Sequence, residues 1–268
     1  MKDKVVIITG ASSGIGRATA LFFAQQEAKL VLAARSYDKL LRLENQIKKF
    51  NINVISIKTD VSKKEDCQKL IQAAVDAYNG IDILINNAGI SMRALFKNTD
   101  ISVLENIMNV NFWGTVYCTK YALPYLLESK GSVIGVSSIA GYIGLPARTG
   151  YSASKFAMHG FLEALRTENL EKGLHVMIAC PGFTNSNIRS SALKADGSQQ
   201  GESPRSEDKM MSAEEVAAYI YKGTVKRKQR TVLTKEGKLA VWLGVRFPRL
   251  MQRLVFNTMK KEPDSPLT

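Results

Sequence analysis

The 268-residue sequence has few of the side chains that build metal sites and disulfide frameworks. Its three cysteines, Cys67, Cys118 and Cys180, are far apart in the chain, and its two histidines are His159 and His175. An odd, widely spaced cysteine set argues against a disulfide framework and a zinc cluster, and indicates reduced thiols. Two histidines leave little material for a Ser-His-Asp triad, and we expect His159 to be a packing or surface residue. We therefore expect no metal site.

Long apolar runs are also missing. The apolar run at residues 5–8 is too short for the core of a signal peptide, and no window of about 18 uncharged apolar residues occurs. The chain is 45% hydrophobic and 23% charged, which is a globular composition and not a disordered or collagen-like one. We expect a cytoplasmic protein built around one large domain, because the length is short for two ordinary domains.

Acidic residues are scarce in one stretch. Residues 222–261 hold twelve Lys and Arg and one acid, Glu236, whereas the last seven residues hold Glu262 and Asp264. Most of the net charge of +13 therefore belongs to one C-terminal element, and the body of the chain is close to neutral. Since the basic stretch also gives no sign of aromatics interleaved with basic residues along an extended groove, we expect no nucleic-acid partner.

Short runs rich in Val, Ile and Leu alternate with helical patterns. These runs do not alternate apolar with polar residues, which is typical of strands buried on both faces of a parallel sheet. The expected strands are 5–9, 30–34, 54–58, 81–86, 132–136, 176–180 and 230–234, and the expected helices are 15–28, 37–50, 63–79, 100–128, 152–172 and one opened by Ser212. This succession predicts a doubly wound α/β fold with helices on both faces of the sheet.

One internal segment interrupts the alternation of strand and helix patterns. Residues 194–209 are polar and rich in Gly and Ser, with no large apolar side chain. Such a segment inside a domain is usually a mobile lid over a site or a disordered insert, and both alternatives remain open.

A glycine-rich turn links the first strand to the first helix. Its glycines Gly10, Gly14 and Gly16 allow a tight turn, close backbone approach to a phosphate and close packing of helix on sheet. The following helix N-terminus presents free N–H groups to a pyrophosphate. At the end of the second strand Ala34 stands where an acid would hold the ribose of NAD, and Arg35 can pair with a 2′-phosphate. The sequence thus favours NADP(H) over NAD(H).

Further motifs follow at the ends of later strands and on two helices. In order, they are Asn86-Asn87-Ala88-Gly89, Asn111, Ser138, Tyr151 with Lys155, and Pro181-Gly182. Tyr151 and Lys155 lie one helical turn apart on one face, and strand carboxyl ends line the ligand crevice of an open sheet. Together with the glycine turn, the set resembles the short-chain dehydrogenase/reductase family over residues 4–234.

The resemblance implies a seven-stranded parallel Rossmann sheet and a homodimer or homotetramer formed through helices equivalent to 105–128 and 152–172. It implies hydride transfer with Tyr151 as general acid or base, Lys155 favouring the phenolate and holding the ribose, Ser138 binding the substrate oxygen and Asn111 holding a relay water. After Pro-Gly the family often has Val-x-Thr; here Ser186 falls at the Thr position and Thr184 is a second candidate. The expected cofactor contacts are Gly10, Ser12, Ser13, Gly14, Ile15, Gly16, Arg35, Asp60, Val61, Asn87, Ala88, Gly89, Tyr151, Lys155, Pro181, Gly182, Thr184 and Ser186.

The residues expected around the substrate are mostly apolar. Besides Ser138, Tyr151 and Phe183, they are Ser91, Met92, Ile139, Tyr142, Ile143, Leu145 and Ile188. We therefore expect a hydrophobic ketone, aldehyde or secondary alcohol, of lipid-, steroid- or ketone-like character. The leading hypothesis is an NADP(H)-dependent oxidoreductase. The alternative is a catalytically silent NADP(H)-binding sensor or membrane-associated interaction protein on the same fold.

The pattern of the C-terminal stretch indicates a basic amphipathic extension. A first helix ends near Val245 and Pro248 starts a second, in which apolar residues recur at helical spacing while the basic side chains lie largely elsewhere. Such a helix suits an anionic membrane surface, and family relatives acting on lipids or steroids have membrane-facing C-terminal helices. Packing on a partner subunit or on the protein's own body stays equally open. We expect a catalytic domain over 1–235 with a lid at about 183–212, and a helical extension over 236–268. On the membrane alternative, residues 236–260 would contact the inner face of a membrane peripherally.

Overall fold

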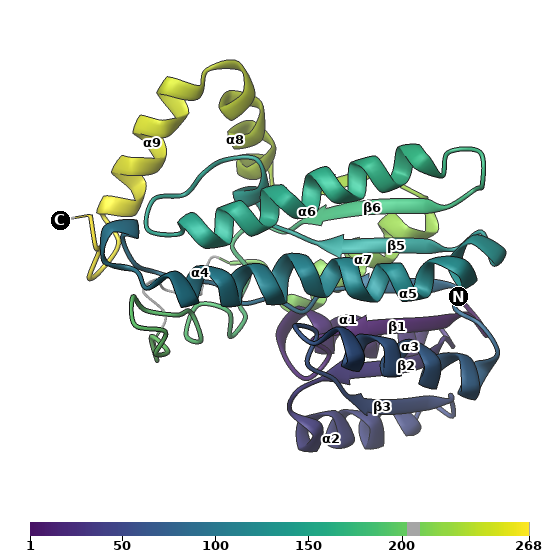
Figure 1. The fold of residues 1–268 in the computed structure, drawn as a ribbon. Coiled ribbons are helices and arrows are strands. Elements are labelled where there is room, and N and C mark those ends of the chain that lie inside the picture. The colour runs from purple at the N-terminus through teal and green to yellow at the C-terminus, as the bar shows by residue number, and fades with distance from the viewer. Residues whose placement is uncertain (203–209, 268) are drawn as a thin grey trace.

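Seven strands form a single parallel sheet at the centre of the molecule (Figure 1). The structure is a computed structural model that describes residues 1–202 and 210–267. The strands are β1 (Val5–Thr9), β2 (Lys29–Ala34), β3 (Val54–Lys58), β4 (Ile83–Asn86), β5 (Ser132–Val136), β6 (His175–Cys180) and β7 (Arg230–Val232). Their order in the sheet is β3-β2-β1-β4-β5-β6-β7, which confirms the predicted doubly wound Rossmann architecture.

The chain order reverses between β1 and β4, which are neighbours in the sheet. Connections on the two sides of this point leave in opposite directions, so a crevice opens at the carboxyl ends of these strands. The glycine turn after β1 and the Asn-Asn-Ala-Gly motif after β4 therefore meet there. Every predicted strand is present, within two residues at each end.

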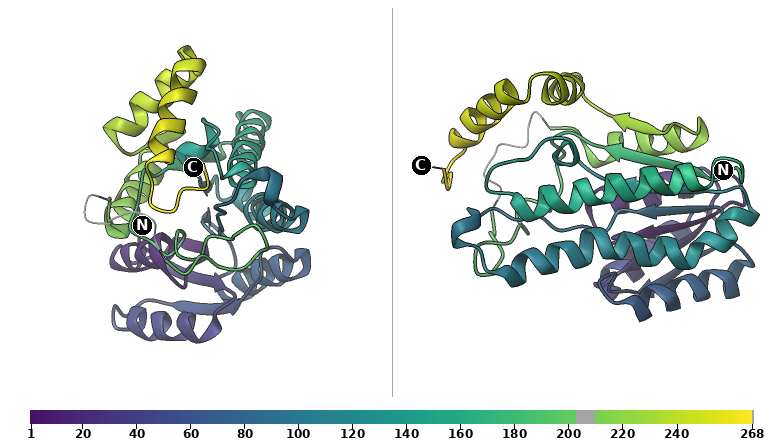
Figure 2. Two further views of the ribbon diagram at one scale, coloured as in Figure 1. Left: turned by 90° about the vertical axis from the view of Figure 1, so that its left-hand side faces the viewer. Right: turned by 45° about the horizontal axis from the view of Figure 1, so that its top comes forward.

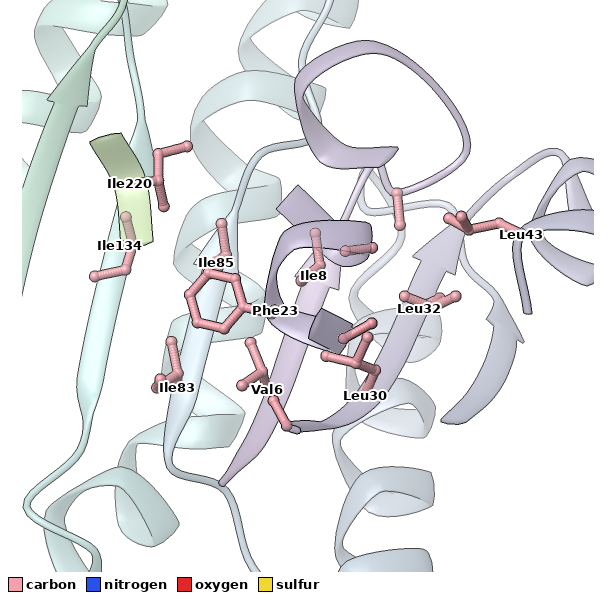
Figure 3. Close-up of a cluster of buried hydrophobic side chains, with 14 of the residues drawn as sticks. Val6, Ile8, Phe23, Leu30, Leu32, Leu43, Ile83, Ile85, Ile134 and Ile220 are labelled. Carbon is pink, nitrogen blue, oxygen red and sulfur yellow. The ribbon is translucent and has the colours of Figure 1, made fainter. Parts of the chain in front are cut away.

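Helices cover both faces of the sheet. They are α1 (Gly14–Gln25), α2 (Tyr37–Lys48), α3 (Lys64–Tyr78), α4 (Ile101–Met108), α5 (Gly114–Glu128), α6 (Thr149–Glu168), α7 (Ala213–Val225), α8 (Lys235–Arg246) and α9 (Pro248–Lys260), with short turns η1 (Phe96–Asn98), η2 (Asn109–Trp113) and η3 (Ile139–Gly141). One core layer joins α1, α2 and α7 to the sheet, with Phe23 fully buried among strand residues such as Ile8 and Ile85 (Figure 3). The second layer joins α3, α5 and α6 to the opposite face.

Two helices differ from their predicted bounds in ways that matter for the site. The predicted helix 100–128 is interrupted by η2, a turn of π-helix that contains Asn111. The helix α6 begins at Thr149 rather than at residue 152, so that Tyr151 lies inside its first turn. The apolar periodicity could not show the π turn, because one extra residue in a turn keeps the residues on both sides helical.

The segment between β6 and α7 is irregular where it is described. Residues 190–202 fold back on themselves, with Gln200 N donating to Ala192 O at 2.8 Å and Gly201 N to Ser190 O at 2.8 Å. Leu193 forms isolated β-bridges, one with Met92 and one with Gln199. The remainder of the predicted lid, residues 203–209, lies outside the described residues.

The C-terminal helices α8 and α9 form a hairpin that stands off the carboxyl edge of the sheet (Figures 1 and 2). The predicted apolar stripe of α9 is divided: Val255 and Met259 are buried against the body, whereas Leu250 and Leu254 are exposed. Among residues 1–202 and 210–267, none of the helices combines the length and apolar character needed to cross a bilayer.

Candidate active site

The glycine turn after β1 has the backbone conformation that its sequence predicts. Gly10 has φ +65° and Gly14 has φ +50°, a region that side chains with a Cβ rarely adopt. A Cβ on Gly10 would lie 2.8 Å from Ala88 Cα, so the two loops touch through backbone. The hydroxyl of Ser13, at the N-cap of α1, makes no capping hydrogen bond to the helix. The first turn of α1 thus keeps N–H groups and a hydroxyl for a ligand.

Asn87 fastens the glycine turn to the end of β4. Its Nδ2 donates to Thr9 O at 2.9 Å and to Gly10 O at 3.2 Å, while Thr9 Oγ1 accepts from the N–H groups of Asn87 and Ala88 at 3.0 and 3.1 Å. The side chain of Asn87 is therefore used to hold the two loops together. The prediction that these residues border the cofactor remains a prediction, but they lie at the crevice where it would bind.

Ser138 and Tyr151 meet at the carboxyl end of β5. Ser138 Oγ caps η3 by accepting from Ala140 N at 3.1 Å, and it hydrogen-bonds the Tyr151 side chain. Tyr151 is only 8% exposed and packs against Met92, Ala140 and Leu193. Burial raises the pKa of the phenol, whereas the hydrogen bond from Ser138 and the guanidinium of Arg148 lower it.

Lys155 lies beside Tyr151 with its ammonium inside the protein. Its Nζ is 5.7 Å from the centroid of the Tyr151 ring and donates to Val136 O at 3.0 Å. Burial lowers the pKa of this lysine to about 8. An ammonium has three donors, and within the described part of the chain one acceptor is in place. Because a Cβ on Gly89 would lie 3.6 Å from Nζ, that glycine leaves the space beside the ammonium free of side chain.

Asn111 is fully buried in the π turn and connects three segments of the site. Its Oδ1 accepts from Ile90 N at 2.8 Å, and its Nδ2 donates to Ile90 O and to Ser154 Oγ, both at 2.9 Å. Ser154 Oγ in turn donates to Tyr151 O at 2.8 Å. The side chain of Asn111 therefore fixes the loop after β4 against the helix that carries Tyr151 and Lys155. That it also holds a relay water stays a prediction.

The two hydroxyls that follow Pro181-Gly182 occupy different environments. Thr184 is buried and its Oγ1 donates to Gly182 O at 3.1 Å. Ser186 is half-buried, and its Cβ would lie 3.2 Å from a Cβ on Gly14, so it borders the phosphate turn. The structure thus brings Ser186 to the crevice, while the hydroxyl of Thr184 is used within its own turn. Phe183 is 52% exposed.

The residues predicted for the adenosine end lie along the carboxyl ends of β2 and β3. Arg35 follows β2 directly and is exposed, with Ala34 buried behind it. Asp60 accepts from both the N–H and the hydroxyl of Ser62, at 3.1 and 2.7 Å, and Val61 packs against Gly114. These side chains are on the opposite side of the glycine turn from Tyr151, as a dinucleotide extended across the switch point requires.

The predicted substrate wall divides into two apolar clusters. One surrounds Tyr151 with Met92, Leu145 and Ile188. The other joins Ile139, Tyr142, Ile143 and Leu145 to α9 and the C-terminal tail. Tyr142 also turns inward, where its ring contacts the His159 ring with centroids 4.6 Å apart, and burial raises its pKa to about 12.

Three charged residues near this wall were missed by the sequence reasoning. Arg148 precedes α6 and is 8% exposed, Arg93 follows the Asn-Asn-Ala-Gly motif, and both approach Glu262 of the tail. The acidic end of a strongly basic extension was visible in the sequence. Nothing in the sequence indicated where that end docks.

The arrangement fits a dinucleotide and a small substrate. The fit rests on three features: a helix N-terminus behind a positive-φ glycine turn, a space without side chain beside the Lys155 ammonium, and a phenol with a hydroxyl partner. Asn111, Ser138 and the Tyr151–Lys155 pair come from three separate segments, η2, the end of β5 and α6, and converge.

Comparisons with known sequences agree with this geometry. A sequence model of the family described as short chain dehydrogenase matches residues 4–197. Dehydrogenase/reductase SDR family member 7B of Mus musculus is 32% identical over 271 residues, which cover 99% of this chain and 84% of that protein. The 11-beta-hydroxysteroid dehydrogenase-like 4A of Arabidopsis thaliana is 36% identical over 94% of this chain and 83% of its own length.

Solved structures share the fold. A short chain dehydrogenase/reductase from Burkholderia phymatum in complex with NAD superposes with a TM-score of 0.83 at 24% identity, over 93% of this chain and 95% of that one. An alcohol dehydrogenase from the archaeon Thermococcus sibiricus, complexed with 5-hydroxy-NADP, gives a TM-score of 0.77 at 22% identity, over 87% and 96% of the two chains. With the family model spanning most of the sequence and relatives matched over most of its length, the chain belongs to the short-chain dehydrogenase/reductase family.

Proposed function

We propose that the protein is an NADP(H)-dependent oxidoreductase that interconverts a carbonyl and a secondary alcohol on a hydrophobic substrate. The observation that carries the proposal is the meeting of Tyr151, Ser138 and Lys155 beside the glycine turn. Membership of an oxidoreductase family supports the reaction class. The two solved neighbours hold NAD and a modified NADP, so the choice of NADP(H) depends on this chain's own residues.

The protein's part in the reaction is to place the substrate oxygen and to move a proton. When bound, the nicotinamide supplies or accepts the hydride at the carbonyl carbon. Tyr151 donates its phenolic proton to the carbonyl oxygen during reduction and takes it back during oxidation. Ser138 donates a hydrogen bond to the same oxygen, where negative charge develops. Asn111 keeps the loop carrying Gly89 and Ile90 against α6, so that Lys155 stays beside the phenol.

The pKa shifts match these roles in the direction of reduction. Because burial raises the pKa of Tyr151, the phenol keeps its proton at neutral pH and is ready to act as an acid. Lys155, with a pKa of about 8, is mostly protonated at pH 7. Its ammonium then stabilises the phenolate that remains after the proton has been transferred.

Preference for NADP(H) rests on the end of β2. An acid at position 34 would repel the 2′-phosphate, and this chain has Ala34 there. The exposed guanidinium of Arg35 can pair with the phosphate through charge-assisted hydrogen bonds. The apolar clusters around Tyr151 and Ile143 support a hydrophobic substrate, because few polar groups face it from these walls.

The decisive experiment follows NADPH absorbance across a panel of carbonyls and alcohols, including long-chain ketones and steroids. Wild-type protein should turn over at least one apolar member, and Tyr151→Phe should lower kcat by about a hundredfold or more while still binding NADPH. NADPH binding without turnover of any substrate would contradict the enzyme proposal and favour the silent nucleotide-binding sensor.

We also propose that the protein forms a homodimer or homotetramer through α5 and α6. Trp113 and Phe156, on this side of the molecule, are 42% and 46% exposed. Light scattering after size exclusion should give a dimer or tetramer, and Trp113→Glu with Phe156→Glu should shift it towards the monomer. A monomeric wild type would contradict this proposal.

Peripheral membrane contact through 236–260 is a separate proposal. The hairpin exposes Leu239, Trp242 and Val245, at 56, 55 and 71%, and the same helix carries exposed basic residues, which are Lys235, Lys238 and Arg246. Apolar side chains with a cationic rim complement an anionic bilayer surface. The protein should sediment with liposomes containing phosphatidylserine, less so at high salt. Partition that is unchanged by Trp242→Glu and insensitive to salt would contradict it.

A further inference from the structure

The last residues of the chain return to the body instead of projecting into solvent. In Figure 1 the tail after α9 descends from the hairpin towards the segment before α4. Ser265 is 6% exposed and its Oγ donates to Met259 O at 2.8 Å, and Leu267 packs against the cluster of Ile143, Val255 and Met259. The tail therefore has its own hydrogen bonds and its own apolar contacts.

A buried carboxylate connects the tail to the catalytic side of the domain. The side chain of Glu262 is 4% exposed, and its Oε2 lies 3.6 Å from Arg93 NH2 and 4.0 Å from Arg148 NH2. Arg93 NH2 also donates to Pro263 O at 2.5 Å. Both arginines are themselves buried, with side chains 7 and 10% exposed. Glu262 thus sits between two guanidiniums that belong to different segments of the site.

These two segments border Tyr151. Arg148 is the N-cap residue of α6, three positions before Tyr151, and its charge lowers the pKa of that phenol. The loop of Arg93 is joined to the residues before α6 by the hydrogen bond from Ala94 N to Ala147 O, at 3.0 Å. Docking of Glu262 therefore fixes the tail to the outer edge of the site.

The apolar contacts of the tail continue the predicted substrate wall. Leu145 packs in the cluster of Tyr151 and also in the cluster of Ile143, Val255 and Met259. On the other side, α8 approaches this wall through two glycines: a Cβ on Gly237 would lie 2.8 Å from Ile139 Cδ1, and one on Gly244 would lie 2.9 Å from Ile143 Cγ1. The hairpin and tail form a second layer directly behind residues that follow Ser138.

We propose that Glu262 is a positioning residue for bulky apolar substrates: by docking on Arg93 and Arg148 it holds the tail and α9 against the substrate-side wall. The proposal rests on the proposed oxidoreductase function. The segment that determines how large a substrate is held therefore includes the C-terminal tail, through Leu267, Met259 and Val255, and not only the loops next to Tyr151.

The strength of this docking follows from burial. Removing the carboxylate takes a charged partner away from two buried guanidiniums, which destabilises the docked arrangement of the tail. Because Glu262 joins the start of the tail to the body, the end of α9 and the tail are expected to open locally in its absence while the seven-stranded domain stays folded.

The test compares Glu262→Gln with a matched control, Asp264→Asn. Asp264 is two residues away, exposed and in the left-handed region at φ +50°, which asparagine also adopts, so the control removes the same charge without removing the docked carboxylate. For Glu262→Gln we expect amide hydrogen exchange over residues 259–267 to accelerate by about tenfold or more. The ratio of kcat/KM between a steroid-sized and a small ketone should fall by about tenfold, mainly through KM. Asp264→Asn should change neither.

A second variant keeps the proposal testable. Arg93→Met should accelerate tail exchange in the same direction, and adding Glu262→Gln to it should have less than the additive effect, because both remove one interaction. Unchanged tail exchange in Glu262→Gln, or equal losses for large and small substrates, would overturn the proposal. If the wild type turns over no substrate, the proposed function fails instead, and the exchange measurement still decides whether Glu262 docks the tail.

Discussion

His159 is a buried titratable side chain that the proposed reaction does not use, and its replacement gives a quantitative prediction. Its Nε2 lies 2.7 Å from Ser137 Oγ and 3.8 Å from Cys180 Sγ, and its ring packs on Gly141, where a Cβ would lie 2.5 Å from Nε2. The imidazole therefore ties the carboxyl ends of β5 and β6 together behind Lys155. The perturbation is His159→Gln, which keeps a polar group but no longer titrates.

The magnitude follows from the change in pKa. Burial, with a smaller contribution from the Lys155 charge, lowers the pKa of His159 from 6.5 to about 4. The unfolded chain therefore binds more protons than the folded one between these values, so stability from this residue is present above pH 6.5 and is lost as the pH falls towards 4. A shift of this size corresponds to about 3 kcal/mol of unfolding free energy, since each pKa unit is worth about 1.4 kcal/mol.

The assay is urea denaturation of wild type and His159→Gln at several pH values from 7 to 4. The wild type should lose about 3 kcal/mol more than the variant over that interval. His175, whose pKa burial also lowers, is present in both proteins and cancels in the difference. Parallel pH dependences for the two proteins would refute the reasoning that His159 is held neutral by its surroundings.

Three further perturbations test other parts of the structure. Gly16→Ala would place a Cβ 2.2 Å from Gly10 O, so we expect the affinity for NADPH to fall by about tenfold or more and the protein to lose about 1–3 kcal/mol of stability. The control Gly160→Ala, where a Cβ would meet no atom within 4 Å, should stabilise α6 by up to about 1 kcal/mol. Fluorescence titration measures the NADPH affinity, and thermal melts measure the stability. Arg35→Ala should raise the Kd for NADPH by about tenfold and leave that for NADH unchanged in the same titration, and equal effects would contradict a 2′-phosphate contact. Phe23→Ala, at a fully buried position, should cost about 3–5 kcal/mol in urea unfolding, while Phe50→Ala, at a position 41% exposed, should cost less than about 1 kcal/mol.

The fold was predictable because its signals are local. Each buried strand is a continuous apolar run, and the turn after β1 must contain glycine at positions 10 and 14, where φ is positive. The convergence of Ser138, Tyr151 and Lys155 was predictable from the rule that strand carboxyl ends meet at one edge. These inferences require only short windows of sequence and the topology that they imply.

The contacts of the C-terminal tail were not predictable in this way. Glu262 meets Arg93 and Arg148 through long-range packing, and no periodicity or spacing in the sequence joins the three. The division of the apolar stripe of α9 into buried Val255 and exposed Leu254 was not predictable either, because it depends on which part of the protein the helix packs against. For Arg35 the sequence provided the hypothesis of a contact with the 2′-phosphate, and the structure adds that this side chain is exposed at the end of β2.

The π turn at Asn109–Trp113 has a consequence for how this region tolerates changes in length. A π turn carries one residue more than an α-helical turn, so deleting a single residue there would let α4 and α5 join as one regular helix. Because the π turn absorbs its extra residue locally, α4 and α5 would keep nearly their present orientation, and Val103 and Ile107 would stay in the cluster beside Tyr151. Asn111, which lies inside the lost turn, would lose its hydrogen bonds to Ile90. The extra residue of the π turn is therefore what places the Asn111 side chain between the loop after β4 and α6.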